Sequence, residues 1–415
     1  MSSLGAYNIL NFNLTSHNGF SLDLKNIFFS IEVYEEIYNN SMSVRVGILD
    51  TENLIRSLPI IGQEKVLLKW DILSDGEYSP IEMNLRVTKI SKLQKAGQKT
   101  NYILEMTTID FLNNFENRVS EYVEGPTSEI VQQIFDKDFA PTSKGLNLEP
   151  SEDDQKLVVP NLTPLKSMTW LSSKAHTATD ASYLFFENNR EYMFKPITKL
   201  YSEESKNTFY VDRTNNLTND SNFEDKNTLA FEWVSNFDVL NNISKGFYNS
   251  TVETIDIVKK EARLFEHSFY ENWDDYEHIE PNPFQDISGT GHQYKPKIEY
   301  VVSENDYGDL QKKHYHEDVF LKRLFQLQSV HNIKCEITVY ADTKLAAGDM
   351  ITLNFGTNFN NETDDQYTGS WLITAMKHQI SRIKNDYRMQ LECVRDSVGV
   401  TYPQPIPILK TGANE

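Results

Sequence analysis

Two stretches far apart in the chain carry the same succession of features, and this internal repeat constrains the fold more than any other property of the sequence. The first reads IIGQEKVLLKW, LRVTKI and NYILEMTTID; the second reads LAAGDMITLNF, WLITAM and DYRMQLECVRD. Gly62 lies 48 positions before Asp110, and Gly348 lies 48 positions before Asp396. Aligning the two stretches needs one-residue shifts inside them. Unrelated antiparallel barrels also share the alternation of apolar and polar residues and the glycines in turns. We interpret the match as a duplication, with two unrelated turn glycines as the alternative.

The first 110 residues have the alternation that is typical of β-strands. Apolar residues occupy every second position in Ile27–Val33 and again in Met42–Ile48, after the polar turn YNNS. Further strand-like runs are Val66–Trp70, Met83–Ile90 and Tyr102–Thr108, separated by SDGEYSP and KAGQK. Short strands at this spacing predict an antiparallel barrel or sandwich.

The next region changes to an α+β pattern. Thr127 is placed to cap a short amphipathic helix, and Thr163 followed by Pro164 is a signal for the start of a second helix. The segment between them is polar and is expected to be a loop. YLFFENNREYMFK then predicts a hairpin that turns at Asn188 and Asn189, because asparagine tolerates the left-handed conformation of tight turns.

Two polar linkers, 215–226 and 271–296, are expected to bracket a further module. The spacing of apolar residues over 310–330 predicts an amphipathic helix that leads into a last β region, 333–398. Beyond it the Pro-rich end of the chain is expected to be extended or disordered.

Composition narrows the classes of function. Sixty acidic against 40 basic side chains give a formal charge of −20, which argues against sequence-specific nucleic-acid binding and would suit either solubility or a surface past which DNA slides. No stretch approaches the roughly 20 apolar residues of a membrane span, and the start lacks a signal-peptide layout, so we expect folding in a cytoplasm without a membrane anchor. Cys335 and Cys393 are expected to be small buried hydrophobes.

Two clusters rich in histidine and acids were weighed as metal sites. HYHED contains His314 and His316, which would point to different faces of a helix, and WDDYEHIE lacks the spacing and glycine of a calcium loop. The sequence also has no GxSxG, GxxxxGK[ST] or HExxH motif. We therefore predict no catalytic, cofactor-binding or metal-binding residues and no enzymatic activity. A glycosidase is the main alternative, because 60 acidic residues offer many carboxylate pairs of the kind that sugar hydrolysis uses.

The order of these features resembles the central baseplate hub of contractile-tail, T4-like bacteriophages, a family related to the trunk of type VI secretion spikes. FFSIEVYEEIYNNSMSVRVGILDTENLIRSLPIIGQEKVLLKW looks like the first tube domain of that family. TPLKSMTWLSSKA with YLFFENNREYMFKPITKL is similar to its second domain, and GSWLITAMKHQISRIKNDYRMQLECV to its terminal tube strands.

The resemblance implies a structural homotrimer in which each chain gives two similar β-barrels, so that three chains adapt a sixfold tail tube to a threefold spike. It implies as partners the central spike, the tail tube or tube initiator, baseplate wedge proteins and a tape-measure protein, within a virion tail assembled in the host cytoplasm. The hub of a non-phage contractile injection system would use the same fold and remains an alternative.

The expected fold class is mainly β with α+β insertions: two similar antiparallel β-barrel tube domains plus smaller α+β domains. The expected domains are a first barrel at 1–118, an α+β domain at 119–212, a second barrel from 213–260 and 320–398, an inserted small domain at 261–319 and an extended tail at 399–415.

Overall fold

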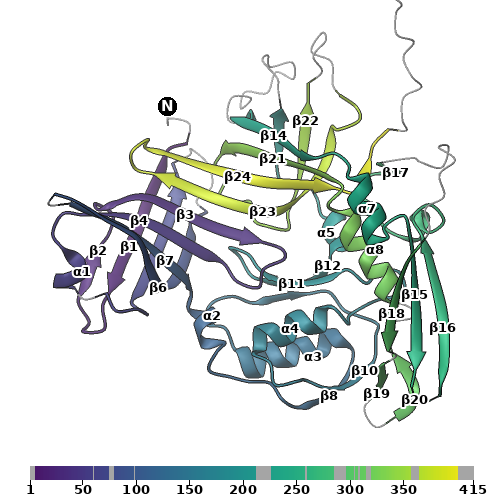
Figure 1. Ribbon diagram of the computed structural model, residues 1–415. Helices are drawn as coiled ribbons and strands as arrows, with labels where there is room; N and C mark the ends of the chain where they lie inside the picture. Colours follow the sequence, from purple (N-terminus) through teal and green to yellow (C-terminus); the bar gives the residue numbers. More distant parts are fainter. Residues whose placement is uncertain are drawn as a thin grey trace, which may run out of the picture.

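The protein is mainly β, as the sequence predicts. The computed structural model describes residues 5–58, 60–73, 79–97, 99–211, 226–257, 259–284, 296–302, 304–306, 309–314, 319–356 and 364–400. The largest sheet of the described residues has 13 strands. A helical layer and a separate three-stranded sheet are attached to it (Figure 1). No helix among the described residues is long and apolar enough to cross a membrane.

The first half of the large sheet is built from the N-terminal region, drawn in purple and blue in Figure 1. Its strands follow the order β3-β4-β7-β6-β5-β1-β2. The predicted pairing of 27–33 with 42–48 is confirmed, because β3 and β4 are antiparallel neighbours. The elements are β1 (Tyr7–Thr15), β2 (Ser21–Asp23), β3 (Phe28–Glu36), β4 (Ser43–Asp50), α1 (Leu54–Ser57), β5 (Lys65–Ile72), β6 (Ile81–Ala96) and β7 (Lys99–Thr108).

The second half of the large sheet is built mainly from the C-terminal region, drawn in yellow and green in Figure 1. Its strands follow the order β14-β21-β24-β23-β22-β13. Cys335 and Cys393 lie opposite each other on β21 and β24, and both are buried free thiols, as predicted. The elements are β13 (Thr208–Val211), β14 (Ala230–Ser235), β21 (Ile333–Tyr340), β22 (Met350–Phe355), β23 (Gly369–Ser381) and β24 (Asp386–Arg395).

The two halves share one strand order. The succession β3-β4-β7-β6-β5-β1 corresponds position by position to β14-β21-β24-β23-β22-β13. They differ at the last strand, since β1 is antiparallel to β5 whereas β13 is parallel to β22. The described strand pairs close neither half into a barrel, so the predicted barrels are open sheets over this part of the chain.

The correspondence extends to the hydrogen bonds at the turn that opens each repeat. The Gln63 N–H donates to the carbonyl of Val87 at 2.6 Å, and the Val87 N–H donates to the carbonyl of Glu64 at 3.1 Å. In the second half, the Gly348 N–H donates to the carbonyl of Ile373 at 2.9 Å, as Gln63 does to Val87. The Ile373 N–H then donates to the carbonyl of Asp349 at 3.0 Å. The same short bridge therefore leads into the repeat on both sides.

A β-bulge occupies the same place in each half. The register between β6 and β7 shifts between Val87 and Lys89, and the register between β23 and β24 shifts between Ile373 and Ala375. Val87 and Ile373 are also the residues that make the bridge to the opening turn. Because a bulge requires a specific extra residue in one strand, its recurrence at matching positions supports duplication over chance similarity.

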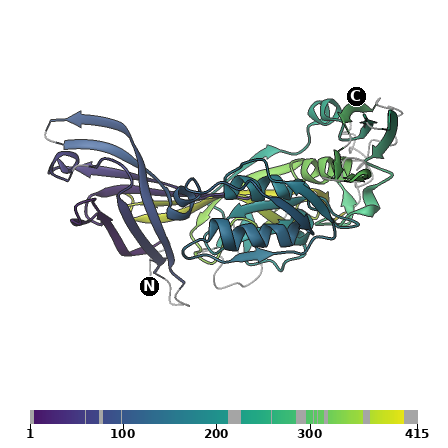
Figure 2. The same cartoon turned by 90° about the horizontal axis from the view of Figure 1, so that it is seen from below.

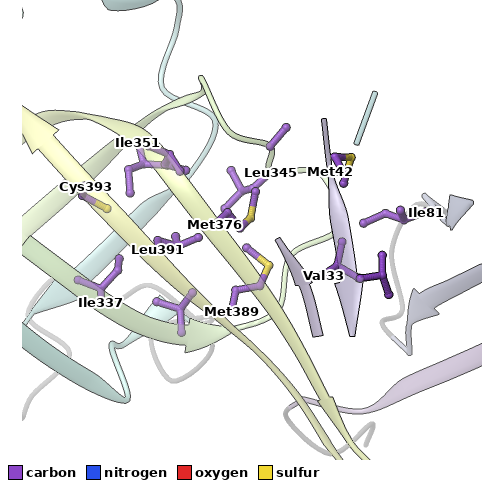
Figure 3. Close-up of a cluster of buried hydrophobic side chains, with 14 of the residues drawn as sticks. Val33, Met42, Ile81, Ile337, Leu345, Ile351, Met376, Met389, Leu391 and Cys393 are labelled. Carbon is purple, nitrogen blue, oxygen red and sulfur yellow. The ribbon is translucent and has the colours of Figure 1, made fainter. Parts of the chain in front are cut away.

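One hydrophobic core runs through both halves. Along β3, β4, β21 and β24 buried positions largely alternate with partly buried or exposed ones, so each strand contributes one apolar face. Figure 3 shows Val33 and Met42 of the first half in the same cluster as Met376, Met389 and Leu391 of the second. Apolar burial at about 25 cal/mol per Å² is the main stabilising contribution here.

A helical layer lies beside the large sheet and below it in Figure 1. α4 begins at Pro164 with Thr163 as its N-cap, as the sequence predicts, and packs against β11. The predicted hairpin is confirmed by antiparallel β11 and β12. Thr127 lies inside α3 instead of capping it, and its N–H and hydroxyl both reach Asp153. The elements are α2 (Ile109–Asn113), β8 (Tyr122–Gly125), α3 (Thr127–Ile134), η1 (Phe135–Phe139), β9 (Leu146–Leu148), β10 (Gln155–Val158), α4 (Pro164–Ser172), β11 (Tyr183–Glu187), β12 (Tyr192–Pro196) and α5 (Ile197–Tyr201).

A three-stranded sheet with two helices beside it forms the end of the molecule farthest from the first half-sheet (Figure 2). The helix predicted over 310–330 is correct only for its second part, because 309–314 form a strand and the α-helix begins at Leu321. The elements are α7 (Val239–Lys245), β15 (Asn249–Asp256), β16 (Glu261–Ser268), η2 (Trp273–Asp275), β17 (Asn282–Pro283), β18 (Lys297–Val302), β19 (Glu304–Asp306), β20 (Asp309–His314), α8 (Leu321–Ser329) and β25 (Ser397–Val398).

Candidate functional site

The junction of the two half-sheets is the feature that most constrains function. β23 pairs with β3 from Ala375 opposite Glu36 to Ser381 opposite Ser30, so the two halves form one continuous surface. The two strands come from opposite ends of the sequence. One side of this surface is the hydrophobic core, and the other side carries the polar positions of each strand.

A row of alternating charge crosses the polar side of the sheet. The register of the ladder places six residues in line, one from each of β24, β23, β3, β4, β7 and β6: Arg388, Gln379, Glu32, Arg45, Glu105 and Lys89. Opposite charges directly across neighbouring strands attract, and each such pair contributes a few tenths of a kcal/mol to about 1 kcal/mol. The row therefore carries charge of both signs without forming a basic or acidic stripe.

Glu32 is the centre of the ionic contacts on this surface. Lys377 Nζ lies 3.1 Å from its carboxylate, and the Tyr34 hydroxyl donates to it at 2.7 Å. Burial acts to raise the pKa of Glu32, but these hydrogen bonds and the charges of Lys377 and Arg45 outweigh it and lower the pKa. Partial burial, followed by the hydrogen bond to Glu32, raises the pKa of Tyr34 to about 12. Both side chains hold one protonation state across neutral pH.

A groove of about 420 Å³ follows the junction on the same side. It is lined by residues of β3, β4, β21, β23 and β24, among them Ser43, Lys377 and Gln390. Two of its acids have partners on neighbouring strands, since Lys334 Nζ lies 2.6 Å from Glu392 and Gln390 donates to Glu336 at 2.9 Å. The groove is polar and carries both signs of charge, with more acids than bases in its lining.

Beneath this surface a chain of buried hydrogen bonds ties the halves together. The Trp70 indole N–H donates to the Tyr387 hydroxyl at 3.1 Å, and that hydroxyl lies 2.6 Å from His378 Nδ1. His378 Nε2 lies 3.1 Å from Glu35 Oε1. All four residues are at most 2% exposed, so each polar atom depends on its protein partner, and not on water, for a hydrogen bond. Trp70 and Glu35 belong to the first half, whereas Tyr387 and His378 belong to the second.

The turn of the β11–β12 hairpin inserts at this junction. The Asn189 N–H donates to Glu35 at 3.2 Å, and its side-chain amide donates to the carbonyl of Leu345 at 2.9 Å. Arg190 forms an ion pair with Asp349 of the turn that opens the second repeat. The helical layer is therefore bound to both half-sheets at the point where they meet.

A buried ion pair fixes the same hairpin to the first half. Lys144 Nζ lies 2.8 Å from Glu187 Oε1, and the Met42 N–H donates to Glu187 Oε2 at 3.0 Å. Burial raises the pKa of Glu187, and the charge of Lys144 only partly offsets that effect. The pair links the helical layer to β4 through the Met42 N–H and is a structural contact.

The two clusters rich in histidine and acids, HYHED and WDDYEHIE, lie on different elements. His314 ends β20, and residues 315–318 of HYHED lie outside the described residues. In WDDYEHIE, His278 stacks on Trp273 with ring centroids 3.6 Å apart, and its Nδ1 lies 2.7 Å from Asp396. Within the described ranges, no group of three or more His, Cys, Asp or Glu side chains gathers as a metal site.

Sequence reasoning missed the buried polar junction. Glu35 falls in phase with Ile31 and Val33 in β3, and this acidic residue at a core position was the available signal. Its partner His378 is 343 residues away, and no local pattern specifies that pairing.

Two solved tail proteins share the overall fold of this chain, which has two like half-sheets joined edge to edge and a helical layer at the junction. The 43 kDa tail protein of prophage MuSo2 from Shewanella oneidensis superposes with a TM-score of 0.57 at 10% identity, covering 94% of this chain and 99% of that chain. A tail protein from Neisseria meningitidis MC58 superposes with a TM-score of 0.54 at 9% identity, covering 94% of this chain and 97% of that chain. The resemblance noted in the sequence is thus confirmed at the level of the fold.

No protein-family model matches the chain. No curated protein matches it either.

Proposed function

We propose that this chain is the central baseplate hub of a contractile tail, a structural protein without catalytic activity. Three copies form a ring whose six half-sheets meet the sixfold tail tube, while the other modules keep the threefold symmetry of the spike. The observation that supports this most is the shared strand order and matching bulges of the two half-sheets. Two like surfaces per chain are what a threefold assembly needs to imitate sixfold symmetry.

The partners follow from this position. One side of the ring binds the tail tube or a tube initiator, and the other side binds the central spike. Baseplate wedge proteins bind at the periphery of the ring. A tape-measure protein passes through the ring or ends at it. The protein then belongs to the virion tail and is assembled in the host cytoplasm.

The polar side of the continuous sheet is the proposed wall of the channel. Acids and bases alternate along much of its cross-strand row, and ion pairs join Glu32 to Lys377 and Glu392 to Lys334. DNA binds proteins tightly where several unpaired cations meet its phosphates. A wall with paired charges lets DNA pass without holding it.

The test is the mass and the symmetry of the assembled protein. Light scattering of the full chain, alone and with its spike, is expected to give three times 48.0 kDa, and electron microscopy a ring with six similar lobes. A chain that stays monomeric with the spike present, or a ring in which the two half-sheets face different ends, would falsify the hub assignment.

The hub of a non-phage contractile injection system is the second candidate, because the same fold would serve it. Sequencing the surrounding genes separates the two. Genes for capsid and packaging proteins nearby favour a phage, whereas their absence beside sheath and spike genes favours an injection system.

A further inference from the structure

The three-stranded sheet at the end of the molecule exposes an apolar face. The register of β15, β16 and β18 places Glu253 beside Leu264 and Tyr300, and the next row on the same face contains Ile255 and Val302. Exposure on this face is high for five apolar side chains: Tyr300 67%, Leu264 57%, Val302 53%, Ile298 48% and Ile255 41%. Soluble monomers rarely expose apolar patches beyond a few hundred Å², and larger ones mark interaction sites.

The opposite face of this sheet is already covered. Val252 is fully buried, and the ring of His267 lies 4.8 Å from that of Phe325 on α8. The sheet and α8 therefore form two layers. The exposed row of Leu264 and Tyr300 points away from the helix, because neighbouring positions along a strand face opposite sides.

A groove of about 840 Å³ lies on the other side of α8, between this helix, α7 and the end of α4. Leu324, Leu327 and His331 line it together with Trp170. At 100° per residue these helix positions fall on a stripe turned away from Phe325, which faces the sheet. The groove and the exposed sheet face thus lie on opposite sides of one pair of layers.

The two surfaces carry charges of opposite sign among their apolar side chains. Glu253 and Glu266 share the exposed face of the sheet with the apolar side chains. Lys174 and Lys245 line the groove together with one acidic residue, Asp238, whose carboxylate caps α7 by accepting the Asn241 N–H at 2.9 Å. An excess of cations in one groove is notable on a chain of formal charge −20. An apolar surface that carries acidic side chains fits an apolar groove lined by more bases than acids.

We propose that the exposed face of β15, β16 and β18 docks into the α4–α7–α8 groove of a second copy of this chain. The contact is head to tail, and a head-to-tail contact closes into a ring when its rotation permits. This inference rests on the trimeric assembly proposed above and names the surfaces that hold it together. It assigns the module outside the half-sheets to subunit contact.

Two variants of the full chain test the contact, each disabling one surface. Tyr300→Glu places a charge in the sheet face, and Leu324→Glu places one in the groove. Light scattering is expected to show the unaltered chain as a trimer and each variant as a monomer. When the two variants are mixed in equal amounts, one intact face meets one intact groove, and a one-to-one dimer of twice the chain mass is expected.

Ile383→Glu is the matched control, since Ile383 is 82% exposed in the turn between β23 and β24. It is expected to remain trimeric. Circular dichroism and Tm check that each variant folds, and Lys245→Glu replaces Leu324→Glu should the latter unfold.

The outcomes separate this inference from the hub assignment. Trimeric Tyr300→Glu overturns the inference and leaves the hub intact, whether or not that variant has lost binding to the spike. A mixture that stays monomeric overturns the head-to-tail arrangement. An unaltered chain that is monomeric with its spike present overturns both.

Discussion

The hydroxyl of Tyr387 accepts the indole N–H of Trp70 at 3.1 Å, and the two residues are 317 positions apart in the chain. The same hydroxyl lies 2.6 Å from His378, so one oxygen serves both half-sheets. The contact lies in a core that excludes water, where an unmet polar group is costly.

Replacing this tyrosine is the most direct test of the junction. Tyr387→Phe keeps the ring but leaves the Trp70 N–H and His378 Nδ1 without their partner. We expect a loss of about 2 to 4 kcal/mol in the free energy of unfolding, measured by urea denaturation. Tyr34→Phe is the control, because its hydroxyl bonds Glu32 at a partly exposed site, and it is expected to cost less than about 1 kcal/mol. An equal loss of unfolding free energy in the two variants would show that the buried hydrogen bonds of Tyr387 stabilise the protein no more than an exposed one.

The buried pair of Lys144 and Glu187 predicts a stability that depends on pH. Burial raises the pKa of Glu187 in the folded protein, so its contribution is most favourable below the unfolded pKa and is lost as pH rises through the folded pKa. Lys144→Met removes the cation that partly offsets the stability lost when Glu187 ionises. We expect it to destabilise the protein by about 3 kcal/mol near pH 7 and by clearly less near pH 4.

The control for that substitution is Lys137→Met. Lys137 pairs with Glu121 at 2.7 Å, but both side chains are well exposed. Exposed pairs contribute about 0 to 1 kcal/mol, so little change is expected at either pH. A Lys144→Met effect that is the same at pH 4 and pH 7 would contradict the role assigned to the Glu187 carboxylate.

His278 is expected to stabilise the folded protein in its charged form, whereas burial disfavours the charged form of Glu187. Burial acts to lower the pKa of His278, but the hydrogen bond and charge of Asp396 outweigh it, and the pKa is raised. The stabilisation is therefore full below the ordinary value of about 6.5 and is lost as pH rises through the folded pKa. His278→Gln is expected to cost about 1 to 3 kcal/mol at pH 5.5 and less at pH 9, measured from Tm. A cost that grows with pH would refute the assignment.

Local patterns in the sequence predicted much of the fold. The alternation in β3 and β4 gave their pairing, and the Thr163–Pro164 signal gave the start of α4, because both depend on neighbours in sequence. The helix expected from Leu310 failed in its first part, since short apolar spacings suit a strand and a helix equally well.

The candidate site itself could be predicted only in outline. The repeat pointed to two like sheets, but their edge-to-edge joining depends on β23 meeting β3, a pairing of opposite chain ends that no local pattern specifies. Closure into barrels was likewise inferred from strand spacing, and spacing does not determine which edges meet.

The two turn glycines that first suggested the repeat give the last prediction. Gly62 has φ +111° and Gly348 has φ +94°, a region that disfavours residues with a Cβ. A Cβ at Gly62 would meet no atom within 4 Å, whereas one at Gly348 would lie 3.0 Å from the ring of Phe186 in the β11–β12 hairpin. The backbone requirement is thus shared, but the surroundings differ.

Alanine at each position separates these two effects. Gly62→Ala is expected to cost about 1 to 2 kcal/mol, because only the backbone is strained. Gly348→Ala carries the same strain and also overpacks the contact with Phe186, which adds about 1 to 3 kcal/mol. Urea denaturation of both variants measures the difference directly. Trimming the ring in the double variant Gly348→Ala with Phe186→Leu is expected to recover part of the extra cost, because the leucine side chain leaves room for the Cβ. Equal losses for the two single variants would mean that the hairpin does not press on the second repeat as described.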